Sequence, residues 1–267
     1  MIRALLALAL LFFAVVGGFF VRPSPYARVG GAARARSRPL PEGLPAPVER
    51  FYRARYGTEL PVVETAVVSG HAWLRPAGPW YLPARFRFVH AAGRDYLHDI
   101  ALTWYGLGVF RVDERFVGGR ARMALPFGVE EHSPQLAQAA TLALWAEAAW
   151  FPTLWVTHEE ARWEPVDETS ATLVVPFESD ELRALIRFAR GSGDVESLEA
   201  ERYRGAADEV PARWSNAARE WTTIDGRWRP RVGSVAWGDD PPWAVFTVTS
   251  VDENVEVEAL LNAPWRR

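Results

Sequence analysis

The stretch from residue 63 to residue 129 alternates apolar and polar residues with a period of two, and glycines interrupt it at a regular spacing. Gly93, Gly106 and Gly119 follow one another at intervals of 13 residues. Parallel strands need crossover connections of about a dozen residues or more, so these short glycine turns predict an antiparallel meander. Its five predicted strands are residues 63–74, 84–91, 96–105, 108–117 and 120–129.

Two helices and a second set of strands complete the predicted fold. Residues 44–57 have apolar residues near helical spacing and end at Gly57, and Ser133-Pro134 is an N-cap and first-turn proline for a helix over 134–150. Further strands are predicted at 161–167, 171–177, 181–190, 195–204, 219–225, 228–237, 244–252 and 255–261. The predicted class is α+β, mostly β: a large curved antiparallel sheet, or half-barrel, of about 11–13 strands with two helices packed on it.

The N-terminal segment adds a predicted transmembrane helix. Residues 4–21 are apolar without a break, and 18 residues at about 1.5 Å each nearly span a hydrocarbon core of about 30 Å. We expect an uncleaved membrane anchor, with a cleaved secretory signal and a buried helix as alternatives. The predicted organisation is residues 1–21 as anchor or signal, 22–43 as a linker rich in Pro, Gly and Arg, and 44–267 as a single β-rich domain.

Two sequence signals give opposite predictions for the side of the membrane on which the domain lies. The arginines after residue 21 favour a cytoplasmic domain, whereas the signal-like start of the chain favours export. We expect an extracytoplasmic domain.

Composition excludes several kinds of site and partner. The chain has no cysteine, so disulfides, thiolate metal sites and lipid attachment through cysteine are excluded. All 30 basic residues are arginine and are mixed with 33 acids, which argues against nucleic acid as a partner. Thirteen tryptophans indicate a large aromatic interior, an apolar groove or a membrane interface.

Motifs for catalysis, cofactors and metals are weak. "HEEAR" at 158–162 has Arg162 where a zinc protease needs its second histidine, and His90 and His98 are predicted to straddle the Gly93 turn on neighbouring strands. No nucleophile elbow, phosphate loop or dinucleotide motif is present. We therefore predict no catalytic residue, no cofactor and no metal site. If the protein were an enzyme, glycoside hydrolysis would be the reaction to test, with Asp113, Glu147 and Asp167 as candidate catalytic acids.

The stretch "LWAEAAWFPTLW", residues 144–155, surrounds Glu147 with aromatic residues. A helical projection of 136–151 places Glu147 on the stripe expected to pack on the sheet, with Gln138 and Thr141 on the other side. A buried carboxylate needs a partner, and we expect an arginine to be the partner of Glu147. The alternatives are that Glu147 is a polar contact on the wall of a cavity or that it acts as a general acid or base. The predicted ligand-binding residues are Glu147, Trp145, Trp150, Phe151, Trp163 and Asp113.

Three segments carry a family resemblance. The chain resembles an uncharacterised bacterial and archaeal family whose domain often follows an N-terminal membrane segment. The resemblance rests on the helix with Glu147, Trp150 and Pro152, on "WEPVD" at 163–167, and on the late pattern of Gly226, Pro230 and Trp237. The likeness covers roughly residues 44–262 and implies no activity. More remotely, the order of elements is similar to periplasmic lipoprotein carriers, in which a curved sheet closed by helices holds acyl chains.

These observations predict a membrane-anchored, non-enzymatic domain. Its ligand would be an apolar or amphipathic, lipid-like molecule in a cavity between helix 134–150 and the curved sheet. The first alternative is a structural or protein-interaction domain of an envelope complex with a filled core, and the second is a glycan-active enzyme. The predicted partners are the membrane, through residues 4–21, and a hydrophobic ligand.

Overall fold

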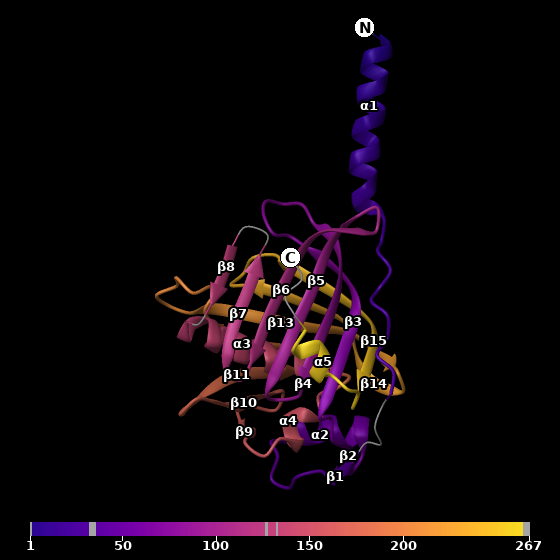
Figure 1. Ribbon diagram of the computed structural model, residues 1–267. Helices are drawn as coiled ribbons and strands as arrows, with labels where there is room; N and C mark the ends of the chain where they lie inside the picture. Colours follow the sequence, from indigo (N-terminus) through magenta and orange to yellow (C-terminus); the bar gives the residue numbers. More distant parts are fainter. Residues whose placement is uncertain (1, 32–35, 126–127, 132, 264–267) are drawn as a thin grey trace.

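Thirteen antiparallel strands form one continuous sheet in the computed structural model, which describes residues 2–31, 36–125, 128–131 and 133–263 (Figure 1). The order across the sheet is β8-β7-β6-β5-β4-β3-β15-β14-β13-β12-β11-β10-β9. The strands are β3 (Thr65–Leu74), β4 (Leu82–Ala91), β5 (Asp95–Trp104), β6 (Leu107–Val117), β7 (Arg120–Leu125), β8 (Gly128–Glu131), β9 (Arg162–Pro165), β10 (Ser170–Phe177), β11 (Asp180–Phe188), β12 (Val195–Arg202), β13 (Ala212–Ile224), β14 (Arg227–Trp237) and β15 (Ala244–Glu253).

The order reflects two meanders that meet at one junction. β3 to β8 run consecutively, β9 to β15 run consecutively, and β15 pairs with β3 to join them. Gly93, Gly106 and Gly119 all have φ between 74° and 78°, the left-handed region that a tight turn requires and that glycine adopts without steric cost. The predicted meander and its glycine turns are confirmed.

Helix α3 (Pro134–Glu147) lies inside the curve of the sheet. It contacts β6 and β7 from one half of the sheet and β10, β11 and β12 from the other. Ser133 caps it by accepting a hydrogen bond from the Leu136 backbone at 3.1 Å, and η2 (Ala148–Trp150) and α4 (Leu154–Thr157) follow. Every residue from Leu136 to Ala146 is buried, so the predicted division into a packing face and an outer face is wrong. The reason is that the sheet surrounds the helix from two sides.

Smaller elements close one end of the sheet. α2 (Ala46–Tyr56) packs there with α4, and a two-stranded sheet of β1 (Ser37–Pro39) and β2 (Glu59–Pro61) lies beside them (Figure 1). Tyr52 of α2 donates a hydrogen bond at 2.6 Å to the carbonyl of Pro152, which lies two residues before α4. β1, β2 and α4 were not predicted, because each has only three or four residues.

The N-terminal apolar segment forms α1 (Ile2–Gly17) and the 3₁₀ turn η1 (Gly18–Phe20), which project from the other end of the sheet (Figure 1). In the described part of the chain, no helix combines the length and hydropathy that crossing a membrane requires. Residues after η1 run along the domain, where Tyr26 donates to Asp99 at 2.8 Å and Arg28 pairs with Asp252 at 2.5 Å.

Two other sequence predictions differ from the structure. Residues 255–261 were predicted as a strand, but α5 (Glu258–Leu261) is a short helix there, because Leu260 and Leu261 bond back to the Val257 carbonyl. Residues 120–129 were predicted as one strand, whereas β7 and β8 are two neighbouring antiparallel strands; residues 126 and 127 lie outside the described residues.

A glycine at the junction of the two meanders provides a test of this fold. A Cβ on Gly70 would collide with the Thr247 backbone oxygen and would lie 2.9 Å from the Phe86 ring. Gly70→Ala should therefore lower the free energy of unfolding by about 1–3 kcal/mol in urea denaturation. The control is Gly191→Ala, where nothing lies within 4 Å of the new methyl group. Equal stability of the two variants would contradict this close strand approach.

Candidate functional site

A cavity of about 280 Å³ lies between α3 and the sheet. One side is built from α3 and η2, which contribute Ala143, Ala146, Glu147 and Trp150. The lining is mostly apolar, and its ionisable side chains are His98, Glu114, Glu147 and Arg202. The other lining residues include Phe88, Ile100, Leu102, Met123, Trp155, Val195, Leu198, Trp214, Asn216, Val235, Trp243 and Phe246. The site is thus a hydrophobic space with a small set of charged groups.

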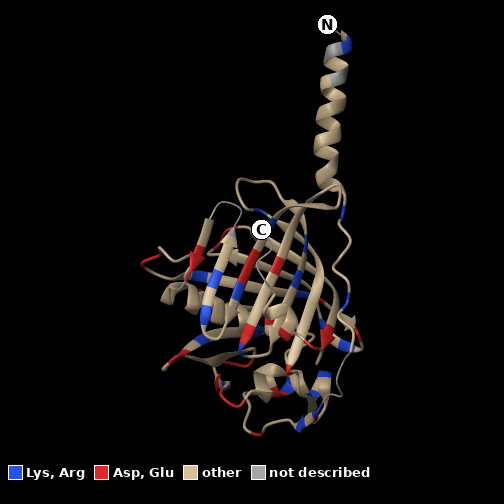
Figure 2. Cartoon of the chain, in the orientation of Figure 1, with Lys and Arg blue, Asp and Glu red and all other residues tan. Residues whose placement is uncertain are grey.

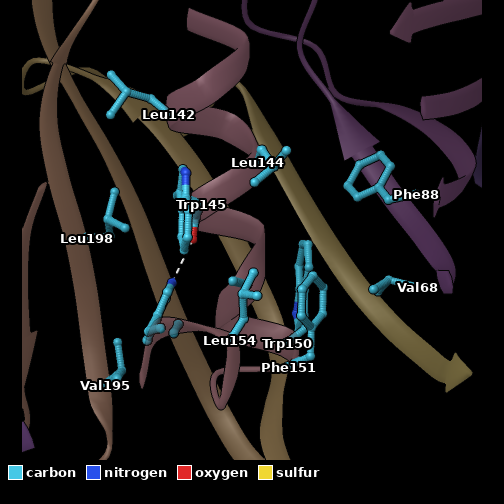
Figure 3. Close-up of a cluster of buried hydrophobic side chains, with 14 of the residues drawn as sticks. Val68, Phe88, Leu142, Leu144, Trp145, Trp150, Phe151, Leu154, Val195 and Leu198 are labelled. Atoms are coloured by element: carbon cyan, nitrogen blue, oxygen red, sulfur yellow. Dashed lines mark hydrogen bonds between the residues drawn. The ribbon is translucent and has the colours of Figure 1, made fainter. Parts of the chain in front are cut away.

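Aromatic side chains gather around this space. Trp150 stacks at 6.4 Å on Phe86 and lies 6.0 Å from Phe88, between ring centroids. Gly233 makes room for Trp150, because a Cβ there would lie 2.9 Å from the indole ring. Figure 3 shows the helical segment between the two halves of the sheet. Val195 and Leu198 of β12 lie on one side of Leu144, Trp145, Trp150 and Leu154, and Val68 of β3 and Phe88 of β4 lie on the other.

The carboxylate of Glu147 lies against two histidines. His98 Nε2 is 2.8 Å from Oε1 and 2.9 Å from Oε2 of Glu147, and His90 Nε2 is 2.9 Å from Oε2. The His90 contact is an ion-pair distance whose geometry falls outside that of a hydrogen bond. The predicted arginine partner of Glu147 is therefore wrong, and histidines from the sheet take its place.

The register of β4 and β5 brings these histidines together. His90 pairs with Tyr96 and Phe88 pairs with His98 across the two strands, so all four side chains lie on the face turned toward α3. His98 also reaches β6, where its Nδ1 lies 3.4 Å from Glu114 Oε2 and the Tyr96 hydroxyl donates to the other Glu114 oxygen. His98 is thus held between two carboxylates.

Burial and charge act in opposite directions on these groups. Burial alone would lower the pKa of His98, but the charge of Glu147 and hydrogen bonds to Glu114 and Glu147 raise it to about 9. Burial alone would raise the pKa of Glu114, but His98, Arg202 and Tyr96 lower it to about 2. The pKa of Glu147 is lowered against its burial by His98 and His90. At neutral pH the cluster holds a charged histidine and two charged carboxylates.

Arg202 completes the charged part of the wall. It is the last residue of β12, is 8% exposed, and donates from Nε to the Ala139 carbonyl of α3 at 3.0 Å. Its guanidinium carbon lies 4.8 Å from the centroid of Trp214 and 5.5 Å from that of Trp237. Burial lowers the pKa of Arg202, while Glu114 and Glu147 oppose that shift.

The structure places the six predicted site residues in different surroundings. Glu147 and Trp150 line the cavity. Trp145 is buried against His158, Phe151 lies against His90, and Trp163 packs on Trp155. Asp113 pairs with Arg115 at 2.9 Å on the opposite face of β6 from Glu114.

Sequence reasoning did not place His90, His98, Glu114 or Arg202 at this site. A signal for the histidines was present, since their spacing of eight residues around Gly93 predicted neighbouring strands, and this pairing is confirmed. The local sequence did not show that both histidines lie on the face of the sheet turned toward α3. Within the described segments, no group of three or more His, Asp or Glu residues is arranged to hold a metal ion.

Comparison with known proteins assigns the chain to a family. DUF6544, described as a family of unknown function, matches residues 34–248 of the 267. The chain belongs to the DUF6544 family. The resemblance to an uncharacterised family is thereby confirmed. No curated protein matches this DUF6544 chain.

Three solved structures are similar to the DUF6544 chain at low sequence identity. A LolA superfamily protein from Nitrosomonas europaea is 10% identical, with a TM-score of 0.44 over 79% of this chain and 94% of that one. An outer membrane lipoprotein-sorting protein domain from Vibrio parahaemolyticus is 10% identical, with a TM-score of 0.42 over 74% and 89%. A DUF1329 family protein from Desulfovibrio piger is 11% identical, with a TM-score of 0.43 over 76% and 91%.

The shifted pKa values predict how stability depends on pH. The pKa of His98 rises from 6.5 to about 9, so its stabilisation is full below pH 6.5 and is lost as the pH rises through 9. The pKa of Glu114 falls from 4.5 to about 2, so its stabilisation is full above pH 4.5 and is lost as the pH falls through 2. The contribution of these two groups to the free energy of unfolding, measured by urea denaturation, should be highest between about pH 4.5 and 6.5.

The alkaline decline isolates the contribution of His98. His98→Gln should remove the decline between pH 6.5 and 9, whereas His71→Gln should retain it, because His71 lies on the outer face of β3 away from Glu147. A wild-type stability that stays constant from pH 6.5 to 9 would contradict a buried charged His98.

Proposed function

We propose that this protein binds one apolar or amphipathic, lipid-like molecule in the cavity between α3 and the curved sheet, and that it catalyses no reaction. The observation that carries the proposal is the cavity itself, a space of about 280 Å³ with a mostly apolar lining. An apolar cavity of about 150 Å³ is enough to bind benzene, so this space supports a larger hydrocarbon group.

The chemical composition of the lining supports a ligand with an apolar part and a polar part. Side chains such as Ile100, Leu102 and Leu198 suit a hydrocarbon chain, while His98, Glu147 and Arg202 add a polar region to the same wall. Ligand sites of this kind are mostly apolar with a few polar groups that fix orientation. A filled structural core would leave no such space.

The acids do not favour the glycan-active alternative. Asp113 pairs with Arg115, and Asp167 accepts a hydrogen bond from the Thr169 backbone in an exposed turn. Glu147 is the one of the three candidate acids that lines the cavity, and the other acid there, Glu114, contacts the same histidine. Two carboxylates joined through one histidine are suited to an ion-pair cluster rather than to flanking a sugar.

We further propose that the N-terminal end of the molecule associates with a membrane. The apolar side chains of α1 are largely exposed, with Leu6 at 59% and Leu10 at 70%, and no charge follows Arg3 along this helix (Figure 2). The β5–β6 turn holds the base of α1, where Tyr105 donates to the Ala14 carbonyl at 2.6 Å. Leu107 and Phe110 on this hairpin are also exposed, and they would extend the lipid-facing surface. The signal-like start supports an extracytoplasmic side.

Filling the cavity should remove ligand binding. Ala146→Phe places a ring where α3 lines the space, so the affinity for an acyl chain carrying a doxyl quencher should fall at least about tenfold. Binding is measured as quenching of tryptophan fluorescence, since Trp150, Trp155, Trp214 and Trp243 line the cavity. Ala54→Phe on the exposed side of α2 is the control, and thermal melting checks that both variants fold. Unchanged quenching in folded Ala146→Phe would overturn the cavity as the site.

Charging α1 should release the protein from lipid. Arginine near the centre of a membrane helix costs about 3 kcal/mol, so Leu8→Arg with Leu11→Arg should abolish flotation of the full chain with phosphatidylcholine vesicles. Val166→Arg is the control, because Val166 is an exposed apolar residue beside the turn where Glu168 contacts α2, at the end far from α1. Equal flotation of both variants would contradict attachment through α1.

A further inference from the structure

The guanidinium of Arg202 is buried without a charged partner. Its Nε is bonded to the Ala139 carbonyl, but within the described ranges no carboxylate lies within ion-pair distance and neither terminal nitrogen has a hydrogen-bond partner. An arginine has five N–H donors, so four remain unused here. Leaving such donors unmet in a buried site is unfavourable.

Open space adjoins these unused donors. In the described part of the chain, the terminal nitrogens of Arg202 are not among the unbonded polar atoms that are wholly covered by protein, so part of their surface is open. Arg202 lines the main cavity of about 280 Å³ and a neighbouring pocket of only about 10 Å³. The rings of Trp214 and Trp237 beside the guanidinium fix its plane. Because the Arg202 side chain lines the cavity beneath α3, a molecule in that cavity can approach these donors.

The charges on the wall limit what that molecule can be. At neutral pH, His98 and Arg202 contribute two positive charges, and Glu114 and Glu147 contribute two negative charges. The charges of these four lining side chains sum to zero, so an anionic or cationic head would add one unbalanced charge to the lined space, which is costly. A pure hydrocarbon would leave the arginine donors unmet. An uncharged acceptor satisfies both conditions.

We propose that the cavity takes an acyl ester or amide, and that the terminal nitrogens of Arg202 donate hydrogen bonds to its carbonyl oxygen. The hydrocarbon chain lies along the apolar lining, and the carbonyl lies at the end of β12. This assignment rests on the proposed function, since it names the class of molecule that occupies the same cavity.

Three ligands of matched chain length test the assignment on the full chain. Decane, methyl decanoate and decanoate share a hydrocarbon chain and differ in having no head, an uncharged carbonyl and a carboxylate. We expect methyl decanoate to bind at least about tenfold more tightly than either of the others at pH 7.5 by calorimetry, the factor for one charge-assisted hydrogen bond. In Arg202→Met this preference for the ester over decane should disappear while decane still binds.

A control variant and a second measurement separate the outcomes. Arg204→Met removes an exposed arginine that also lies over Trp237, at 5.1 Å, but does not line the main cavity, so it should keep the preference. In wild-type protein, the infrared carbonyl stretch of carbon-13-labelled ester should shift to lower frequency on binding, which needs no folded variant. Equal affinity for ester and decane, tighter binding of decanoate, or an unshifted stretch would each overturn the assignment and leave a lipid site. Binding of none of the three would overturn the proposed function itself.

Discussion

The contact of Glu147 with His98 and His90 is the constraint on which the arrangement of helix and sheet depends. Glu147 is the only charged residue of α3 and stands at the helix C-terminus, where the helix dipole disfavours a negative charge. A protonated His98 between Glu147 and Glu114 offsets both that disfavour and the cost of burial. The carboxylate therefore fixes the end of α3 against β4 and β5, and the rest of the helix needs no polar face because the sheet encloses it.

The same arrangement explains why a space remains beneath α3. Ala143 and Ala146 of α3 and Ala149 in the next turn line the space between the helix and the sheet. Their side chains are too small to fill the distance that the curve of the sheet leaves there. Trp150 and Trp214 occupy part of this gap, and Gly233 is required for Trp150 to fit. The void borders the ion-pair cluster rather than lying apart from it, so one wall has both apolar and charged character.

Local sequence signals were enough for most of the long strands and for the longer helices, but not for the shortest elements or for the site. Long alternating segments between Gly93, Gly106 and Gly119, and the cap at Ser133, are patterns confined to a few neighbouring residues, and the structure has elements where they indicate them. The partners of Glu147 come from strands about fifty residues earlier in the chain, and Arg202 comes from a strand about fifty residues later, so only the register and curvature of the sheet bring them together. The face of α3 was predicted wrongly for the same reason, since a sequence window cannot show that a sheet will surround a helix. Residues 255–261 failed because a short alternating run fits a strand as well as a helical turn.

The central claim is that the space under α3 is a ligand site, and anomalous diffraction from a bound bromine tests it most directly. Crystals of the full chain grown with a bromine-labelled decanoyl ester should show a bromine peak inside the cavity, among Ile100, Leu198 and Trp214. A peak confined to the exposed side chains of α1 or the β5–β6 hairpin, with only ordered water or protein side chains in the space beneath α3, would contradict the account.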